Sequence, residues 1–153
     1  RFAGTAGVAV LDEAGLAAVP AGGCDLVLLI SVLQYLDDDA LAQVLAAVRP
    51  LLAPSGRLVI GDVVRPDTGM LADALDLLAF ARNEDFLAAA VWGLVRTLAS
   101  DYRTVRKRAG FSTWRPDTLA ARLAELGWQS EVLARNIGHS RHRFSMAARP
   151  LRS

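Results

Sequence analysis

The chain has 153 residues, of which 53% are hydrophobic and 22% are charged. This balance provides enough apolar side chains for a core and excludes an intrinsically disordered protein, and the length favours one domain. The formal net charge of +1 gives no overall attraction to nucleic acid or to a membrane surface.

Two strands are expected near the N-terminus. Residues 7–11 form a short run with two valines that ends at Asp12, and this pattern predicts a strand. A turn over 20–23 follows. Residues 25–30 (DLVLLI) are apolar without alternation, which predicts a parallel strand with both faces buried.

A helix and another strand come next. Three consecutive aspartates at 37–39 predict an N-cap and an acidic first turn. Apolar residues then recur at helical spacing, at Leu41, Val44, Leu45 and Val48. A Pro-Ser-Gly sequence at 54–56 closes the following loop, and residues 57–60 predict a strand with Asp62 at its C-terminal end.

The middle of the chain predicts helices, because apolar residues recur from residue 70 with a period near 3.6. The most apolar window is 86–99. It is too short for a membrane span, which needs about 20 apolar residues, and it contains Arg96. We interpret it as a core or lid helix.

A basic stretch at 103–108 follows these helices, and such a stretch is usually a solvated helix face. Tyr102 and Trp114 flank it. The sharper alternative is therefore a helical lid over about 70–114 that covers an anionic or aromatic substrate, with both aromatic residues as substrate contacts.

The C-terminal part predicts one helix and two strands. Pro116 suits the first turn of the helix and Gly127 suits its end. The apolar stripe of this helix consists of Leu119, Leu123 and Leu126. Residues 129–134 and 143–148 are strand-like, and the linker 135–141 permits an antiparallel pair.

This order of elements predicts an α/β domain, a partial Rossmann-like three-layer sandwich with a mostly parallel sheet and an antiparallel C-terminal strand. Ligands of such sheets bind beyond the carboxyl ends of the strands. The polar residues that interrupt the apolar pattern at those ends are Asp12, Ser31, Gln34 and Asp62.

Three stretches carry a family resemblance by their order and spacing. They are CDLVLLISVLQYL at 24–36, VRPLLAPSGRLVI at 48–60, and the helix with its following strand start at 116–128. Together they resemble the fourth strand, the LLKPGGRLVI segment and the helix before the sixth strand of class I S-adenosylmethionine-dependent methyltransferases. Ser55 replaces one glycine of that segment. The resemblance covers about residues 7–150 and implies that fold, that cofactor, and methyl transfer to a small molecule.

The resemblance also implies cofactor contacts. Asp12, with Glu13 beside it, takes the place of the acid that receives the adenine amine. Ser31 and Val32 take the place of residues along the methionine part of the cofactor. The simpler alternatives are that Asp12 only ends a strand and that Ser31 is a small residue required by packing. We expect no metal site at 37–39, because one short acidic run lacks spaced ligands.

On the acceptor side, the resemblance implies that Gln34 and Tyr35 face the substrate. The family usually has a histidine where Gln34 stands, and a glutamine cannot act as a general base near neutral pH. Methyl transfer from a sulfonium depends chiefly on alignment, so this change is compatible with activity. Asp62 and His139 are further catalytic candidates. The alternatives are a helix entry with Tyr35 in the core, a loop cap by Asp62, and a surface position for His139.

One feature of the family is missing, because no strand followed by a glycine-rich loop occurs in the sequence. Glu13 and Cys24 are too close in sequence for a helix and a strand between them. Residues 7–11 therefore correspond to the third strand of the family, and the edge of the strand at 25–30 is left bare. Three outcomes stay open: a longer protein, a partner chain that supplies the missing half, or pairing of 7–11 with 25–30.

Two functions stay open as well. The first is methyl transfer by the C-terminal part of a class I methyltransferase, and the second is a cofactor-free interaction or dimerisation module. The expected partners are a small-molecule substrate and either a second copy or the missing N-terminal half, and not nucleic acid or a membrane. Cys24 is the only cysteine, which excludes an internal disulfide framework and fits a cytoplasmic location.

Overall fold

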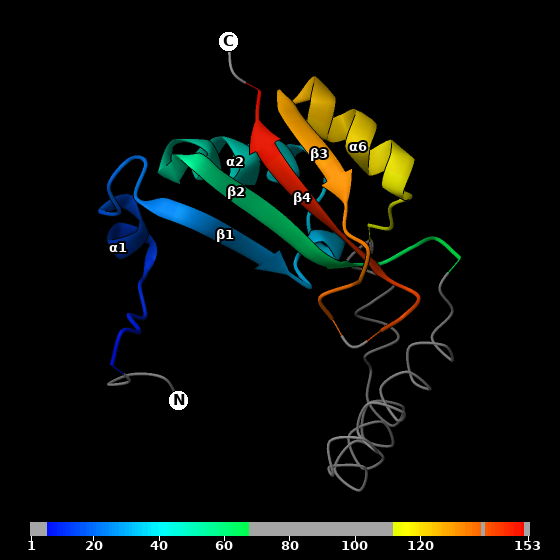
Figure 1. Cartoon of the computed structure of the whole chain (residues 1–153), viewed down its shortest axis with the longest axis horizontal. Coiled ribbons are helices and arrows are strands. Elements are labelled where there is room, and N and C mark those ends of the chain that lie inside the picture. The colour runs from blue at the N-terminus through cyan, green and yellow to red at the C-terminus, as the bar shows by residue number, and fades with distance from the viewer. Residues whose placement is uncertain (1–5, 68–111, 139, 152–153) are drawn as a thin grey trace, which may run out of the picture.

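A computed structural model describes residues 6–67, 112–138 and 140–151. The first part of the chain contains two helices and two strands, with single turns of 3-10 helix around α2 (Figure 1). In chain order its elements are α1 (Glu13–Ala17), β1 (Cys24–Ile30), η1 (Leu33–Tyr35), α2 (Asp38–Val48), η2 (Arg49–Leu51) and β2 (Leu52–Val63). The second part contains α6 (Pro116–Glu125), β3 (Trp128–Val132) and β4 (Phe144–Pro150).

The strands form one mixed sheet in the order β1-β2-β4-β3. β1 and β2 are parallel, whereas β4 runs antiparallel to both β2 and β3. The predicted α/β class, with strands mostly in one direction and an antiparallel C-terminal strand, is therefore confirmed.

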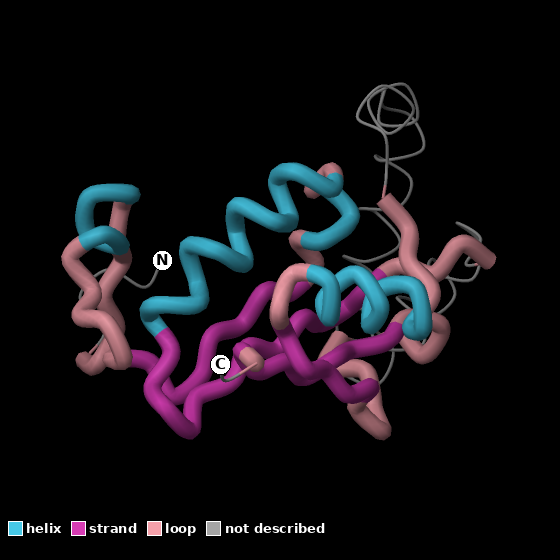
Figure 2. The backbone as a smooth tube through the Cα atoms, turned by 90° about the horizontal axis from the view of Figure 1, so that it is seen from above, coloured by secondary structure: helices cyan, strands magenta, loops and turns pink. Residues whose placement is uncertain are grey.

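The described helices cover one face of the sheet, as Figure 2 shows for α2 and α6. Leu58 and Ile60 of β2 are fully buried in the core on this face. The helices contribute fully buried leucines to the same core, namely Leu41, Leu45, Leu119 and Leu123. The described residues thus supply two of the three layers that the sequence predicts.

The opposite face of β1 is open. Leu26 is 47% exposed and Leu28 is 52% exposed, although both belong to the apolar run that predicted burial on both faces. That prediction is wrong for the described residues. The physical reason is that no described helix packs against this face, so only the alternate residues Val27 and Leu29 reach the core.

β1 is also an edge strand, because its single described neighbour is β2. The bare edge expected at this strand is confirmed within the described residues. The other prediction, a strand over 7–11, is wrong: these residues are neither a strand nor paired with β1. A β-strand is stabilised by backbone hydrogen bonds to a neighbouring strand, and no described strand pairs with this segment.

The predicted start of α2 is confirmed. The Asp37 carboxylate accepts a hydrogen bond from the Ala40 backbone N–H at 2.8 Å, and Asp38 and Asp39 occupy the first turn. Negative side chains at this end offset the positive pole of the helix dipole. The leucine stripe then directs α2 onto β1 and β2.

The predicted helix and strand pair at the C-terminal end are confirmed, with bounds shifted by one or two residues. Gly127 ends α6 with a φ of +78°, a conformation that favours glycine. The apolar window at 86–99, the other helices expected from residue 70 and the basic stretch at 103–108 lie outside the described residues. None of the described helices has the length and apolar character needed to cross a membrane.

Arg49 joins the two parts of the described chain. Its Nη2 atom donates to the carbonyl oxygens of Leu126 and Gly127 at 2.7 and 2.9 Å, directly after the end of α6. Its guanidinium also lies 5.3 Å from the centre of the Trp128 ring. Arg49 therefore fixes the end of α6 and the start of β3 against the end of α2.

We predict that Arg49→Ala lowers the free energy of unfolding by about 2 kcal/mol, because it removes two charge-assisted hydrogen bonds and a cation–π contact. Urea denaturation measures this change. Arg57→Ala, at an exposed position of β2, is the matched control and should cost less than about 0.5 kcal/mol. Equal losses for the two variants would contradict this role of Arg49.

Candidate functional site

The carboxyl ends of β1 and β2 meet in an unusual backbone conformation. Ser31, directly after β1, has a φ of 55°, and Asp62, near the end of β2, has a φ of 60°. The left-handed region is uncommon for residues other than glycine, and such residues cluster at functional sites. The Ser31 Oγ donates to Asp62 Oδ2 at 2.7 Å, and the Ser31 N–H donates to the Gly61 carbonyl at 3.1 Å.

The Asp62 carboxylate is the centre of this arrangement, with its side chain only 3% exposed. Oδ2 also accepts from Arg143 Nη1 at 2.7 Å, and Oδ1 accepts from Asn136 Nδ2 at 3.0 Å. Three different segments of the chain thus converge on one buried carboxylate. We call Ser31, Asp62, Asn136, Arg143 and Ser145 the rim network.

Asn136 and Ser145 fasten the loop between β3 and β4 to this network. Ser145 Oγ donates to Asn136 Oδ1 at 2.7 Å and accepts from the Ile137 N–H at 3.0 Å. The Asp62 N–H donates to Asn136 Oδ1 at 3.1 Å. Gly138 follows at a close approach, where a Cβ atom would overlap the Asp62 carboxylate. The loop therefore lies directly against the end of β2.

The protonation state of Asp62 follows from these contacts. Burial raises its pKa, but the hydrogen bonds from Ser31 and Asn136 and the positive charge of Arg143 outweigh burial and hold the pKa below its usual 3.8. A carboxylate stabilised in this way is a poor proton acceptor. The arrangement supports a positioning role for Asp62 more strongly than the catalytic role predicted for it.

Gln34 lies beside the rim network and is buried, with 5% of the residue exposed. Its Nε2 donates to the Ser31 carbonyl at 2.7 Å. Its Oε1 is buried and has no hydrogen-bond partner among the described residues. A buried acceptor without a donor is costly, and such atoms in native structures call for an explanation, such as a ligand or water.

The segment just before α6 closes this end of the site. The Ser112 N–H donates to the Gln34 carbonyl at 3.0 Å, and the Trp114 N–H donates to the Val64 carbonyl at 2.9 Å. The Trp114 ring packs against the core, and its Nε1 is the second buried side-chain atom without a described partner. Trp114 and Gln34 are therefore held on the same rim, at the ends of β2 and β1.

The structure brings together many of the residues predicted for the site. Ser31, Val32 and Gln34 follow β1 directly, and Asp62 and Trp114 lie at the end of β2. Tyr35 ends η1 at the same rim but is 61% exposed, so it is not the core residue that the alternative proposed.

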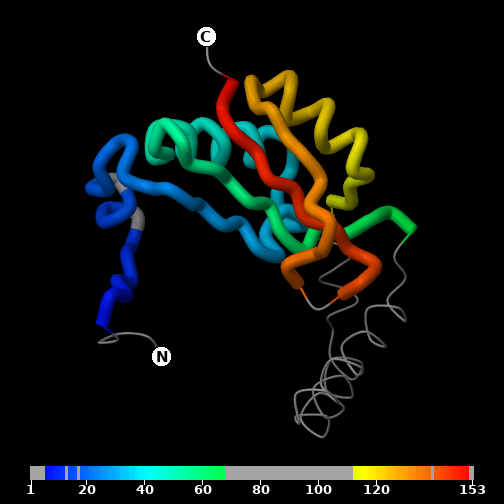
Figure 3. The backbone as a smooth tube through the Cα atoms, viewed as in Figure 1, coloured from blue at the N-terminus to red at the C-terminus, as the bar shows by residue number. Residues whose placement is uncertain are grey.

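Two predicted cofactor contacts lie elsewhere. Asp12 caps α1, where its Oδ1 accepts from the Gly15 N–H at 2.8 Å, and Glu13 is the first residue of that helix. Figure 3 shows α1 beside the start of β1, away from the end where Ser31 lies. Tyr102 and His139 lie outside the described residues.

Sequence reasoning missed Asn136, Arg143 and Ser145. Apart from His139, the sequence predicts only a linker over 135–141, and it predicts only a strand position for Arg143. One signal was available: Ser145 interrupts the apolar run of β4, and it is fully buried. A polar residue in a buried strand needs a hydrogen-bond partner nearby, and the polar loop offers one.

No family model and no curated protein matches the chain. Solved structures do match. They include the mitomycin 7-O-methyltransferase MmcR (17% identity, TM-score 0.51), the pyocyanin biosynthetic protein PhzM (17% identity, TM-score 0.50) and LaPhzM (22% identity, TM-score 0.50). Each match covers 88–89% of this chain. The chain has a class I methyltransferase fold. The chain spans 32% of the length of each of these three structures.

The described residues fit one part of an S-adenosylmethionine site. The left-handed turn at Ser31 and the buried Oε1 of Gln34 lie beyond the carboxyl ends of the parallel strands β1 and β2, where open α/β sheets bind their ligands. The expected acid for the adenine amine, Asp12, is not at this rim. Of the residues that the resemblance assigns to the cofactor, Ser31 and Val32 lie at this rim and Asp12 does not.

The lowered pKa of Asp62 predicts a pH-dependent stability. The contribution of Asp62 is fully present above the unfolded pKa of about 3.8 and is lost as the pH falls through the lower folded pKa. Asp62→Asn should lower the unfolding free energy by about 3 kcal/mol at neutral pH and should flatten its decline between about pH 5 and pH 3.

Urea denaturation at several pH values measures this effect. Asp25→Asn is the matched control, since Asp25 is exposed at the other end of β1. If Asp62→Asn kept the full wild-type decline between about pH 5 and pH 3, the rim network would not contain a stabilised carboxylate.

Proposed function

We propose that this chain is the acceptor side of an S-adenosylmethionine-dependent methyltransferase that acts on a small molecule. The single observation that carries the proposal is the rim, where an ordered turn at Ser31 and an unpartnered buried Gln34 Oε1 lie beyond β1. In open α/β sheets this is the position of the ligand. The similarity of the fold to solved methyltransferases supports the same conclusion.

Gln34 is a positioning residue in this proposal. Its Nε2 is already used by the Ser31 carbonyl, so the side-chain orientation is fixed and Oε1 is left as an acceptor. A hydroxyl or amine of the methyl acceptor would donate to it. The cofactor supplies an electrophilic methyl group on a sulfonium, and the reaction depends on the alignment of the nucleophile with that methyl. A neutral amide can provide alignment without acting as a base.

The remaining walls of the site belong to residues beyond this sequence or to another chain. The bare edge of β1 and its exposed Leu26 and Leu28 support this division, since an apolar strand of this kind is normally covered on both faces. The chain spans 32% of the length of each of the three solved structures described above. We propose that the missing half of the methyltransferase fold, or a second copy of this chain, covers β1. We also propose a cytoplasmic location.

The second candidate is an interaction module without cofactor. The same open edge and face favour it, because unpaired N–H and C=O groups beside exposed leucines form a surface for another strand. The two candidates differ in whether a protein extended upstream binds the cofactor.

Calorimetric titration with S-adenosylhomocysteine separates them. This chain should bind in the millimolar range or not at all, whereas a protein extended through the upstream coding sequence should bind at least about a hundredfold more tightly. Tight binding by the chain alone would refute the division of the site. An extended protein that folds and does not bind would refute the methyltransferase proposal and leave the interaction module.

We predict that Gln34→Met reduces methyl transfer by the extended protein about tenfold or more, because the acceptor loses its alignment. Folding should change by less than about 1 kcal/mol, because the variant loses one hydrogen bond and also removes an unsatisfied buried oxygen. Transfer of labelled methyl to a panel of phenols and aryl acids measures the activity.

Gln43→Met provides the matched control, since Gln43 lies exposed on α2. It should leave methyl transfer unchanged. Wild-type activity in Gln34→Met, with the same acceptors, would contradict the positioning role.

A further inference from the structure

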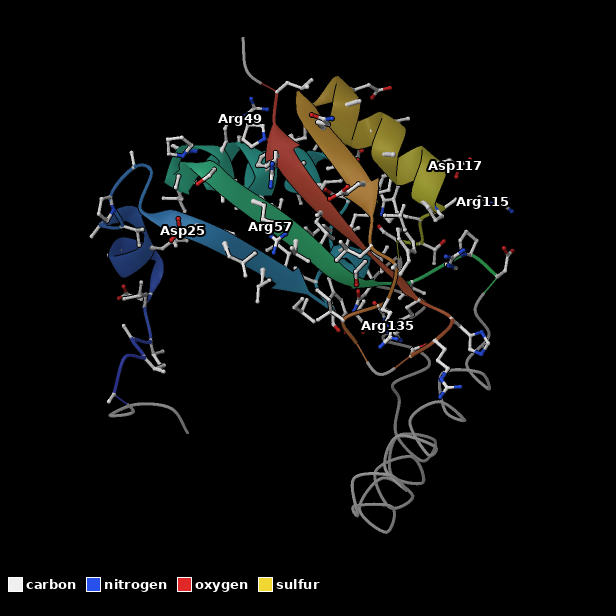
Figure 4. All side chains as sticks on the ribbon, viewed as in Figure 1. Asp25, Arg49, Arg57, Arg115, Asp117 and Arg135 are labelled. Atoms are coloured by element: carbon white, nitrogen blue, oxygen red, sulfur yellow. The ribbon has the colours of Figure 1, made fainter. Side chains whose placement is uncertain are left out.

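An arginine-rich groove lies next to the rim network. Its volume is about 590 Å³, and it runs along the loop between β3 and β4 with Arg65 on the other side. Its described lining includes four arginines, Arg65, Arg135, Arg141 and Arg143, and no aspartate or glutamate. Figure 4 shows Arg135 at the rim, at the opposite end of the sheet from Arg49.

The described lining of the groove has an excess of positively charged side chains. Arg143 is neutralised by Asp62 at 2.7 Å, with side-chain exposures of 16% and 3%. The described residues that line the groove include no carboxylate beside Arg65 and Arg135. The whole chain has a net charge of only +1, so this local excess is a property of the groove rather than of the general surface.

Two contacts hold the groove in shape. Arg65 lies over the buried Phe144 ring, with its Cζ 5.2 Å from the ring centre, which keeps this guanidinium at the start of β4. On the other side, Asn136 Nδ2 donates hydrogen bonds to Asp62 Oδ1 and to the Ser140 carbonyl oxygen. Asp62 also accepts from Ser31, so the groove and the proposed methyl-transfer rim share one buried carboxylate.

We propose that this groove binds an anionic group, a carboxylate or a phosphate, that is carried by the methyl acceptor. Guanidinium groups bind both anions through paired N–H donors, and several of them around one cavity favour an anion over a neutral group. The proposal rests on the proposed function for the identity of the ligand as the acceptor. The anion site itself rests on the groove alone.

Titration of the labelled chain with benzoate, phenyl phosphate and neutral benzyl alcohol, followed by NMR, tests the site. The backbone amides of Ala134 and Gly138 should shift with either anion and not with the alcohol, and the anion that binds more tightly identifies the group. Binding should weaken as the ionic strength rises from about 0.05 to about 0.5 M. Amide shifts with benzyl alcohol equal to those with the anions would overturn the proposal.

A matched pair of variants separates the groove from general charge. Arg135→Gln should weaken anion binding about tenfold, as expected for the loss of a charge-assisted hydrogen bond. Arg57→Gln removes the same charge from an exposed site on β2 and should leave binding unchanged. Equal weakening by both variants would overturn the site. Far-UV circular dichroism confirms that each variant is folded.

These titrations contain no cofactor, so their result is independent of the test of the proposed function. If the chain binds the anions but the extended protein does not bind S-adenosylhomocysteine, the anion site stands and its role in methyl transfer is refuted. Cofactor binding without anion binding would overturn this inference alone.

Discussion

The constraint on which the rest of the site depends is the burial of one carboxylate. Asp62 is almost inaccessible, and a buried negative charge is stable only when hydrogen bonds and an opposite charge surround it. Ser31, Asn136 and Arg143 meet this requirement from β1, the β3–β4 loop and the start of β4. The requirement therefore fixes three segments against one another and orders the turn after β1, where a ligand would bind.

The sheet presents two unequal faces, and this asymmetry links the fold to the proposed function. Leu58 and Ile60 are buried under α2 and α6, whereas Leu26 and Leu28 are half exposed beside an unpaired edge. The apolar composition of β1 suits a central strand, yet the described sheet ends with it. Parallel strands of this composition are normally covered on both faces, so under the proposed function the surface that covers β1 would also complete the cofactor site.

The sequence predicted those features that local patterns determine. The aspartates at 37–39, the leucine stripe of α2 and the glycine after α6 specify their helices. The polar residues that interrupt the apolar pattern predicted a rim with Ser31, Gln34 and Asp62, but also with Asp12, which caps α1 instead. Long-range partners were not predictable. Nothing near Arg143 indicates that it pairs with Asp62, 81 residues away. The strand at 7–11 failed for a related reason, since its composition favours a strand but its neighbour is absent from the described chain.

The central claim is that Asp62 is an ionised carboxylate held by its neighbours at the ends of the strands. The most direct test is the carbon-13 resonance of its side-chain carboxyl group, followed by NMR as the pH is lowered and assigned with Asp62→Asn. The account predicts a titration midpoint below the usual 3.8. A midpoint above that value would show that burial outweighs the contacts from Ser31, Asn136 and Arg143, and would contradict the account.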